Sequence, residues 1–459
     1  MIDLKDLREN PDVYRRAAKL KRIDVDIDKL LELDGKQRAL EMQRQKLTAE
    51  KNSLSKQAGK GIGTLKSQLK KDEEVLQQST PETELHLVAS QNAAQTRQKL
   101  AELQLRPAEI KQQEQAIAAQ VAELEPQILE LLLRCAQPAD DDVPVGKNDS
   151  ENVEIKKWGT IRQFDFNPKD HMTLGAELNL IDVDRGVKLA GSRSYFLIGD
   201  GALLHQAVLR LAQDMMVEQG FVPMTVPVMV REPAMVGTGY FPLGREQSYV
   251  MSNEEPAKYL VGTAEVSLTA YHMDETLDGK TLPRKYVGMS PCFRREAGTY
   301  GKDTAGLYRI HQFDKVEQVI ICKNDIEESK RWHEMILQNA EAILQKLDLP
   351  YRVVKVCTGD LGQGQVAKYD IETWMPSRNS YGETHSASRF YDFQARRLNL
   401  RYRDEDGKVR ICHTLNNTVI ASPRVLIPIL ELYQNADGSI SIPQVLRQYM
   451  GGRAIIGSR

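Results

Sequence analysis

Leucine recurs at every seventh position in the first part of the chain. The spacing holds at Leu33, Leu40, Leu47 and Leu54. Polar residues fill the intervals, which predicts a helix from about Ile27 with one narrow apolar seam. A second seam with the same spacing runs through Leu103, Ile110, Ile117, Leu124 and Leu131. Two such helices can bury their seams against each other in antiparallel orientation, so the pattern predicts a helical hairpin.

The stretch between the two seams contains residues that interrupt helices. Three glycines lie within residues 59–63, and the polar run Ser79–Pro81 follows, so we expect the chain to loosen or turn near this tip. Pro107 and Pro126 fall within the second helix, where each removes a backbone donor. We therefore expect kinks in the return helix.

After Cys135 the sequence becomes AQPADDDVPVGKNDSENVEI, whose Pro, Asp, Asn and Gly residues indicate a linker. Beyond it, short apolar runs typical of strands alternate with helical stretches near 201–219 and 325–347. The strand-like runs are Tyr195–Ile198, Tyr286–Met289, Val316–Cys322 and Tyr351–Val356. This alternation predicts an α+β domain, a mixed sheet flanked by helices.

The composition limits the class and the compartment. With 459 residues, of which 41% are hydrophobic and 27% charged, the chain suits a protein of two or more folded domains. No apolar run is long enough to span a bilayer and the first residues lack a secretory apolar stretch, so we expect a cytoplasmic protein with no membrane partner. Five cysteines without CxxC spacing indicate reduced thiols and no zinc site.

Charge is distributed unevenly over the hairpin, although the whole chain is nearly neutral at −2. Residues 36–71 contain ten Lys or Arg against two Glu, whereas residues 99–130 contain three Lys or Arg against six Glu. A solvated coiled coil explains such charge without any ligand. The alternative is a basic arm that follows the phosphates of a nucleic acid. The residues of the hairpin alone leave both interpretations open.

The segment Cys292–Glu317, CFRREAGTYGKDTAGLYRIHQFDKVE, has two strand-like ends around a loop rich in Gly and charge. It resembles motif 2 of class II aminoacyl-tRNA synthetases, in the form found in seryl-tRNA synthetases. Thr263–Glu265 resembles the serine-binding TxE loop of that family, and His413–Arg424 resembles its motif 3. Met224–Val230, with Pro227, resembles motif 1, the dimer-forming strand region. The resemblance spans essentially the whole chain, because the family also has a basic hairpin that binds tRNA.

The resemblance implies a fold and an activity. The expected fold is α+β, a class II antiparallel sheet flanked by helices and preceded by an antiparallel α-helical coiled-coil arm. Residues 1–134 would form the tRNA-binding domain, and residues 135–459 the linker and the catalytic domain. The implied activity is ATP-dependent ligation of L-serine to tRNA(Ser) through seryl-adenylate, extended to tRNA(Sec) where that tRNA exists. A homodimer that uses ATP and Mg²⁺ is implied as well.

The resemblance also assigns roles to residues. The serine carboxylate attacks the α-phosphate in line, so arginines are needed to hold two anions together. Arg294 would reach the α-phosphate and the serine carboxylate with its planar fork of donors, and Arg424 would hold the γ-phosphate. The remaining ATP residues are Arg295, Glu296 for the adenine amino group, Phe313 for ring stacking, and Glu383, Thr384, His385 and Ser386. Glu383 and Ser386 would also bind Mg²⁺.

The serine pocket must pair an ammonium group and a hydroxyl group. The matching positions are Thr263, Glu265, Arg294, Glu317, Asn416 and Thr418. A pocket that hydrogen-bonds the substrate hydroxyl can reject alanine and glycine, because its own polar groups would stay unpaired.

The chain departs from the family pattern in three places. Thr418 stands where serine is usual, and its methyl group narrows the expected pocket. Gly382 stands where arginine is frequent, and Glu383–Arg389 replaces the common EISSCSN. Ala421–Pro423 replaces a small, Gly-containing run ahead of Arg424.

Each motif has an ordinary structural interpretation when taken alone. Thr263 could cap a helix, Arg424 could be a surface charge, and His311 and His385 could be satisfied structural residues. Gly359–Gly364 lacks the Gly-Lys-Ser/Thr ending of a phosphate loop and is expected to be a turn.

Two rival functions remain open. One is a ligase of the same fold that loads a carrier protein, against which the basic arm argues. The other is a non-catalytic RNA-binding coiled-coil protein. The intact set of Arg294, Glu296, Phe313, Glu317 and Arg424 argues against it.

Overall fold

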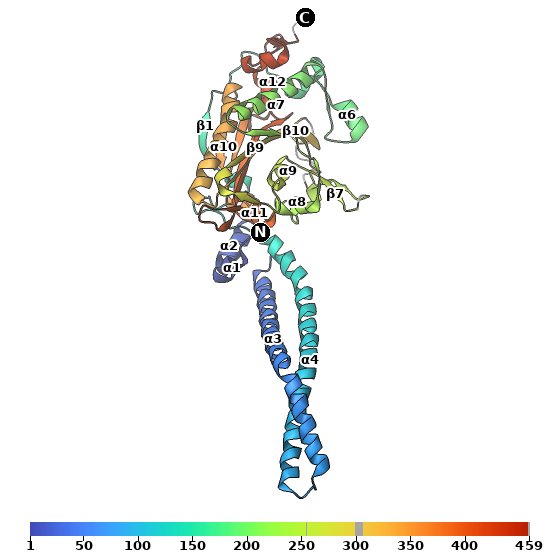
Figure 1. Ribbon diagram of the computed structural model, residues 1–459. Helices are drawn as coiled ribbons and strands as arrows, with labels where there is room; N and C mark the ends of the chain where they lie inside the picture. Colours follow the sequence, from blue (N-terminus) through green and yellow to red (C-terminus); the bar gives the residue numbers. More distant parts are fainter. Residues whose placement is uncertain (254, 299–305, 458–459) are drawn as a thin grey trace. The chain divides into compact units, whose positions relative to one another are not determined.

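The computed structural model describes residues 1–253, 255–298 and 306–457 (Figure 1). The chain forms two compact units. Residues Met1–Val25 and Leu133–Arg459 make one of them, and Asp26–Leu132 makes the other. The predicted division between residues 134 and 135 stays a prediction. None of the helices in the described ranges is both long and apolar enough to pass through a lipid bilayer.

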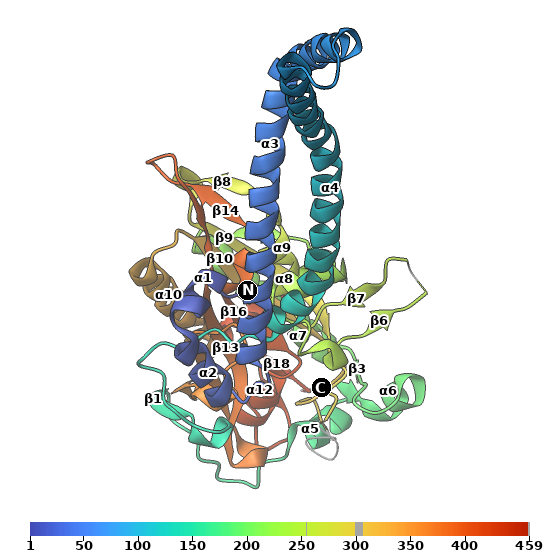
Figure 2. The ribbon, with the colours of Figure 1, turned by 90° about the horizontal axis from the view of Figure 1, so that it is seen from below.

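Two long helices form the second unit. They are α3 (Ile27–Gln78) and α4 (Glu84–Arg134), which lie side by side in Figures 1 and 2. The Asp26 side chain accepts a hydrogen bond from the Lys29 backbone N–H, which begins α3, and the turn at Ser79–Pro81 ends it as predicted. Gly61 and Gly63 lie inside α3, so the glycines do not interrupt the helix.

The pairing of α3 with α4 is antiparallel. Glu73, late in α3, pairs with Arg97 at 2.6 Å, whereas Lys51, earlier in α3, pairs at 2.7 Å with Glu114, which comes later in α4. The apolar seam of α4 is buried at Leu100, Ile110, Ile117, Val121, Ile128 and Leu132, while Leu103, Leu124 and Leu131 are half-buried. The helix runs through Pro107 and Pro126 without ending. The sequence pattern therefore predicted this hairpin and its seam.

An eight-stranded sheet is the centre of the first unit. Its strand order is β1 (Val153–Trp158), β11 (Tyr351–Lys355), β12 (Ala367–Met375), β13 (Ser380–Tyr391), β16 (His413–Ser422), β10 (Gln312–Cys322), β9 (Arg284–Phe293) and β4 (Val222–Met224). All neighbours pair antiparallel except β4 and β9, which are parallel. The four strand-like runs and both helical stretches predicted from the sequence are present.

Smaller elements surround this sheet. The other helices are α1 (Leu4–Glu9), α2 (Pro11–Leu20), α5 (His171–Glu177), α6 (Val183–Ala190), α7 (Asp200–Glu218), α8 (Glu232–Gly237), α9 (Glu265–Ala270), α10 (Ile326–Lys346), α11 (Phe393–Arg397) and α12 (Leu426–Leu432). The short strands are β2 (Ile181–Asp182), β3 (Phe196–Leu197), β5 (Met229–Arg231), β6 (Val250–Met251), β7 (Lys258–Leu260), β8 (Thr276–Asp278), β14 (Arg401–Arg403), β15 (Val409–Ile411), β17 (Ile440–Ser441) and β18 (Ile455–Ile456).

The two faces of the large sheet are covered differently. Helices α7, α10 and α12 bury one face, where Val316 and Ile320 of β10 contribute to the main core. On the other face, Val319 and Ile321 of the same strand pack with α9 and the segment after α11. Because side chains alternate along a strand, Phe313, Lys315 and Glu317 point to this second face. Lys315 and Glu317 of β10 therefore lie on the face of the sheet that α9 covers.

Two irregularities in strand pairing decide which side chains share that face. The register shifts between Val316 and Glu317 where β10 pairs with β16. As a result, Val419 of β16 has no cross-strand partner on β10. A second shift, between Ile371 and Glu372 of β12, has the same effect on β13 at Thr384. Each bulge brings two side chains three residues apart onto one face.

Candidate active site

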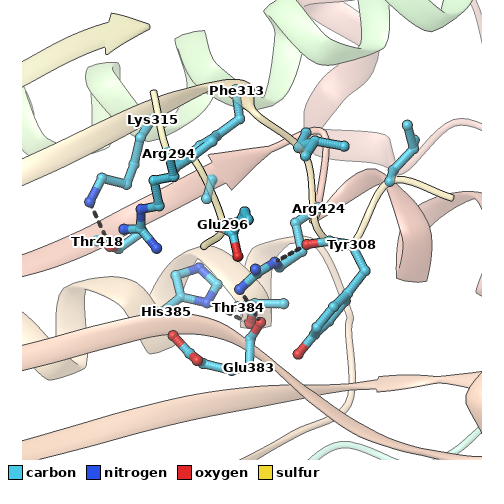
Figure 3. A pocket seen from close by; sticks show the side chains of 13 residues that line it. Arg294, Glu296, Tyr308, Phe313, Lys315, Glu383, Thr384, His385, Thr418 and Arg424 are labelled. Atoms are coloured by element: carbon cyan, nitrogen blue, oxygen red, sulfur yellow. Dashed lines mark hydrogen bonds between the residues drawn. The ribbon is translucent and has the colours of Figure 1, made fainter. Parts of the chain in front are cut away.

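Arg294 and Arg424 come from separate stretches of the chain and line the same space (Figure 3). Arg294 follows β9 directly, and Arg424 lies between β16 and α12. Two cavities, with about 510 and 1130 Å³ of empty space, both have these arginines in their walls. The other residues common to both walls are Glu296, Tyr308 and Glu383.

The guanidinium group of Arg424 is held by three contacts. Its Nε donates to the Tyr308 carbonyl at 3.1 Å, and one terminal nitrogen donates to the Glu383 carbonyl at 3.0 Å. The group also lies 4.4 Å from the centre of the Tyr308 ring. Backbone carbonyls from two segments thus fix its orientation before any ligand binds.

Arg294 is positioned by the end of β9. Its backbone N–H donates to the His311 carbonyl at 2.9 Å, and its guanidinium carbon lies 5.3 Å from the centre of the Phe313 ring. Glu296 adopts a left-handed backbone conformation with φ of 51°, and its carboxylate accepts from Arg309 at 3.4 Å. The side chain of Arg295 is exposed and lines neither cavity.

The bulge in β13 places Glu383 and Ser386 on one face, opposite Glu372 and Asp370 of β12. The side chain of Glu383 is exposed to the cavities. Although desolvation opposes ionisation, the positive charges of Arg424, Lys368 and Arg294 hold the pKa of this carboxyl below its usual range. Glu383 is therefore an anion beside two arginines.

Thr384 and His385 are buried next to Glu383 and also line the smaller cavity. The Thr384 hydroxyl lies 2.7 Å from that of Thr373 and 2.8 Å from His385 Nδ1. Burial lowers the pKa of His385 to about 3, so its imidazole is neutral. Its other ring nitrogen, Nε2, is buried without a hydrogen-bond partner in the described part of the chain, so these contacts satisfy only one side of the ring.

The bulge in β16 gathers a second polar group. Lys315 Nζ lies 2.7 Å from Glu317 Oε2 and 3.3 Å from Thr418 Oγ1. The Thr418 hydroxyl lies 3.3 Å from the same Glu317 oxygen. All three side chains are buried, so the carboxylate, the ammonium and the hydroxyl form one compensated cluster.

Glu265 lies beside this cluster at the start of α9. One carboxylate oxygen accepts from Tyr240 at 2.8 Å and the other accepts from Gln394 at 2.8 Å. Burial, and then the negative charge of Glu317, raise the pKa of Glu265 to about 7. The Thr263 hydroxyl accepts from the Glu265 backbone N–H at 3.2 Å, although the N-cap residue of α9 is Ala264 and not Thr263.

Asn416 of β16 is also buried, on the same side as Thr418. Its amide nitrogen has no hydrogen-bond partner within the residues that the structure describes. An unpaired buried donor is costly unless a ligand satisfies it. The structure thus offers a buried donor on β16, two residues before Thr418, that a ligand could satisfy.

Several neighbours were not identified from the sequence. Tyr308, Lys315, Arg309, Tyr240 and Gln394 contact the residues named above. The only sequence signal for Lys315 and Arg309 was their place within the motif 2 segment. Tyr240 and Gln394 lie outside every motif, and the fold brings them to Glu265.

Gly382 stands where the family frequently has arginine, and the structure explains this difference. A Cβ atom at this position would lie 3.0 Å from Cε2 of Tyr308 and 3.1 Å from the sulfur of Met375. The Tyr308 ring instead lies between two guanidinium groups, at 4.3 Å from Arg378 and 4.4 Å from Arg424. Glycine at 382 leaves the room that this ring needs. Residues 299–305 of the motif 2 segment lie outside the described residues.

Comparisons with known proteins match both units. Residues 249–433 match the tRNA synthetase class II core domain (G, H, P, S and T), and residues 1–99 match the Seryl-tRNA synthetase N-terminal domain. A serine–tRNA ligase of Deinococcus radiodurans is 40% identical over 457 residues, which cover 100% of this chain and 99% of the relative. The chain belongs to the seryl-tRNA synthetase family.

Solved structures of this seryl-tRNA synthetase family agree with the fold. The seryl-tRNA synthetase of Pyrococcus horikoshii, complexed with ATP, matches with a TM-score of 0.85 and 36% identity, covering 99% of both chains. The cytoplasmic serine–tRNA ligase of Naegleria fowleri, in complex with AMP, matches with a TM-score of 0.82 and 30% identity, covering 97% of this chain and 96% of that one. The predicted α+β class II fold with its N-terminal arm is confirmed, and the chain is a class II enzyme for ATP-dependent ligation of serine to tRNA.

The raised pKa of Glu265 predicts how pH changes the stability of this seryl-tRNA synthetase. Between about pH 4.5 and 7, the unfolded chain loses a proton that the folded chain keeps, so the unliganded protein loses stability as pH rises. Glu265→Gln lacks this loss, so its stability relative to the natural protein should rise by up to about 3 kcal/mol from pH 4.5 to 8. Urea unfolding at both pH values measures the difference. An equal difference at the two pH values would show that Glu265 has an ordinary pKa.

Proposed function

We propose that this enzyme forms seryl-adenylate in the space between Arg294 and Arg424 and transfers the seryl group to tRNA(Ser). The single observation that supports this most strongly is that the two arginines line the same pair of cavities. Cations from separate motifs can there hold one triphosphate and one carboxylate together. The Thr418, Glu317 and Glu265 side chains beside that space supply the amino acid site.

The first reaction is a displacement at the α-phosphorus. One oxygen of the serine carboxylate forms the new bond to phosphorus while the bond to the pyrophosphate oxygen breaks. Arg294 can donate to both anions at once because its guanidinium carries a planar fork of N–H groups. Arg424, held by the Tyr308 and Glu383 carbonyls, would keep the γ-phosphate in line with the attack. No side chain needs to act as a general base, because the carboxylate is already ionised.

The adenine would lie between Phe313 and Glu296. The Phe313 ring offers a stacking surface next to Arg294, and the Glu296 carboxylate can accept from the adenine amino group. Arg295, Thr384 and His385 complete the proposed ATP set. Of these, Thr384 and His385 would shape the wall of the smaller cavity, since both are buried and engaged with each other.

Serine selection would use two carboxylates and three neutral polar groups. Glu265 and Glu317 suit the substrate ammonium group, and Thr263, Asn416 and Thr418 suit the hydroxyl group. The unpaired amide nitrogen of Asn416 supports this assignment, because a bound oxygen would satisfy it. A substrate without a hydroxyl would leave that donor unpaired, which favours serine over alanine and glycine. The methyl group of Thr418 adds bulk to the same wall.

Magnesium would bind at Glu383 and Ser386. The residues fit, because Glu383 is an exposed carboxylate held ionised, and one oxygen of the adjacent Asp370 is buried without a hydrogen-bond partner in the described part of the chain. The described residues contain no cluster of three or more Asp, Glu, His or Cys side chains suited to a metal. A carboxylate and a hydroxyl instead suit a hard cation that keeps water and phosphate oxygens as its other ligands. When bound, the cation would neutralise phosphate charge.

The basic helix α3 would bind the phosphates of tRNA(Ser). Lys46, Lys56, Lys66 and Lys70 have exposed side chains along it. The same surface would accept tRNA(Sec) where that tRNA exists. We also propose that the enzyme is a cytoplasmic homodimer that pairs through the motif 1 region around Pro227, so its mass in solution would be twice 51.9 kDa.

The role of Arg294 can be tested by ATP–pyrophosphate exchange. Arg294→Ala should abolish serine-dependent exchange, and Arg294→Lys should lower it at least about 100-fold, because an ammonium group cannot hold two anions in a planar fork. Arg331→Ala, an exposed position on α10, is the matched control and should retain exchange. Near-normal exchange by Arg294→Ala would refute its assigned role. Exchange with no amino acid preference, together with loading of a carrier protein, would support the rival ligase.

The dependence of the rate on Mg²⁺ tests whether Glu383 binds the metal. Chelation of Mg²⁺ should stop exchange, and Glu383→Gln should raise the Mg²⁺ concentration for half-maximal rate about ten-fold or more, because an amide oxygen replaces an anionic ligand. Thr373→Val, which changes the buried partner of Thr384, serves as the control for packing at this bulge. An unchanged Mg²⁺ requirement in Glu383→Gln would remove Glu383 from the metal site.

The arm can be tested separately from the adenylation site. The combined change of Lys46, Lys56, Lys66 and Lys70 to Gln should raise KM for tRNA(Ser) and reduce its salt dependence by about one unit of slope for each lost phosphate contact. Pyrophosphate exchange should stay normal. Replacing exposed Glu123 and Glu125 of α4 by Gln is the matched control. If KM for tRNA(Ser) and its salt dependence are unchanged in the lysine variant, these lysines do not contact tRNA and serve solubility instead.

A further inference from the structure

His205 lies on α7, on the face of the sheet opposite the cavities. Its neighbours Leu204 and Val208 are part of the main core with Val316 and Ile420. The imidazole side chain is 14% exposed. No motif includes this residue. Any effect of His205 on the cavities must therefore act through the residues that it contacts on the sheet.

The imidazole contacts two strands at once. Nδ1 lies 2.8 Å from Ser422 Oγ at the end of β16, and Nε2 lies 3.0 Å from Asp314 Oδ2 near the start of β10. Asp314 and Ser422 are register partners in the β10–β16 ladder. His205 therefore joins both members of the last cross-strand pair, and Ser422 is fully buried under it.

Each of these contacts is adjacent to an ATP residue. Asp314 follows Phe313 directly, and because side chains alternate along the strand, fixing Asp314 on the back face orients Phe313 on the cavity face. Ser422 is two residues before Arg424, whose backbone leaves the sheet at this point. We propose that His205 is a positioning residue for ATP, which sets the adenine-stacking ring and the γ-phosphate arginine at the correct separation from behind the sheet.

The chemistry of imidazole suits this task. Its two nitrogens point in different directions on one rigid ring, so Nε2 can donate to the Asp314 carboxylate while Nδ1 contacts the Ser422 hydroxyl. A rigid connection between two strands matters because displacements near 1 Å lower the rates of positioned reactions strongly. Ser422 and Pro423 belong to the run that departs from the family pattern, so the contact accompanies a local change of sequence. The inference rests on the ATP roles proposed above for Phe313 and Arg424.

The effect should fall on ATP and not on serine. His205→Ala should raise KM for ATP about ten-fold in pyrophosphate exchange, the size expected for losing hydrogen bonds that include a charged partner, and leave KM for serine unchanged. Ser422→Ala should raise KM for ATP less, and the double variant should resemble His205→Ala, since both changes remove the same contact. His205→Gln, which keeps a donor for Asp314, should recover part of the loss. Gln206→Ala, at the exposed neighbouring position, is the control.

The same assay separates failure of this inference from failure of the ATP site. Arg424→Ala and Phe313→Ala should both raise KM for ATP; if they do and His205→Ala does not, His205 has no positioning role. If neither direct variant affects ATP, the ATP assignments are wrong and this inference falls with them. An equal rise of KM for ATP and for serine in His205→Ala, or a loss that follows its thermal unfolding temperature without rescue by Gln, would assign His205 to stability alone.

Discussion

The balance of buried charge is the constraint on which this site depends. Glu317 is buried and is acceptable there because Lys315 lies 2.7 Å away. Glu383 is kept ionised by Arg424, Lys368 and Arg294. Glu265 accepts hydrogen bonds from two neutral donors, Tyr240 and Gln394, while burial and the negative charge of Glu317 raise its pKa to about 7. Two of these carboxylates are thus paired with cations, and the third, Glu265, would gain from an incoming cation.

This balance also explains how one site can receive substrates of opposite charge. The triphosphate would approach the side where guanidinium groups are held by carbonyls, and the ammonium of serine would approach the side where Glu265 and Glu317 lie. Lys315 stands between the two regions, because it lines the smaller cavity and also pairs with Glu317. Separation of charge within a few residues of one sheet gives the reacting carboxylate and phosphate a common meeting point.

The sequence predicted much of the fold because its signals are local. The heptad seams predicted the hairpin, and the strand-like runs predicted the sheet, since burial patterns repeat within each element. Gly61 and Gly63 were expected to loosen the chain but lie within α3, where packing along α4 outweighs a cost of about 1 kcal/mol for each glycine. The resemblance named Arg294 and Arg424, and the structure shows that they face the same cavities. Gln394 and His205 could not be predicted, because their partners come from segments more than a hundred residues away. Tyr240 lies 25 residues from its partner Glu265, and no local pattern marks that contact.

The two bulges have a consequence for how this family can vary. An extra residue at Val419 and another at Thr384 keep the reactive side chains on one face of the sheet. Loss of the extra residue itself would leave the flanking pairs, Glu317 with Thr418 and Glu372 with Glu383, on the same face. A residue gained or lost elsewhere in β13 or β16, with no bulge to absorb it, would instead move every following side chain to the opposite face of the sheet. A substitution changes one side chain and leaves the others in place, so these strands accommodate a change of length most readily at the two bulges.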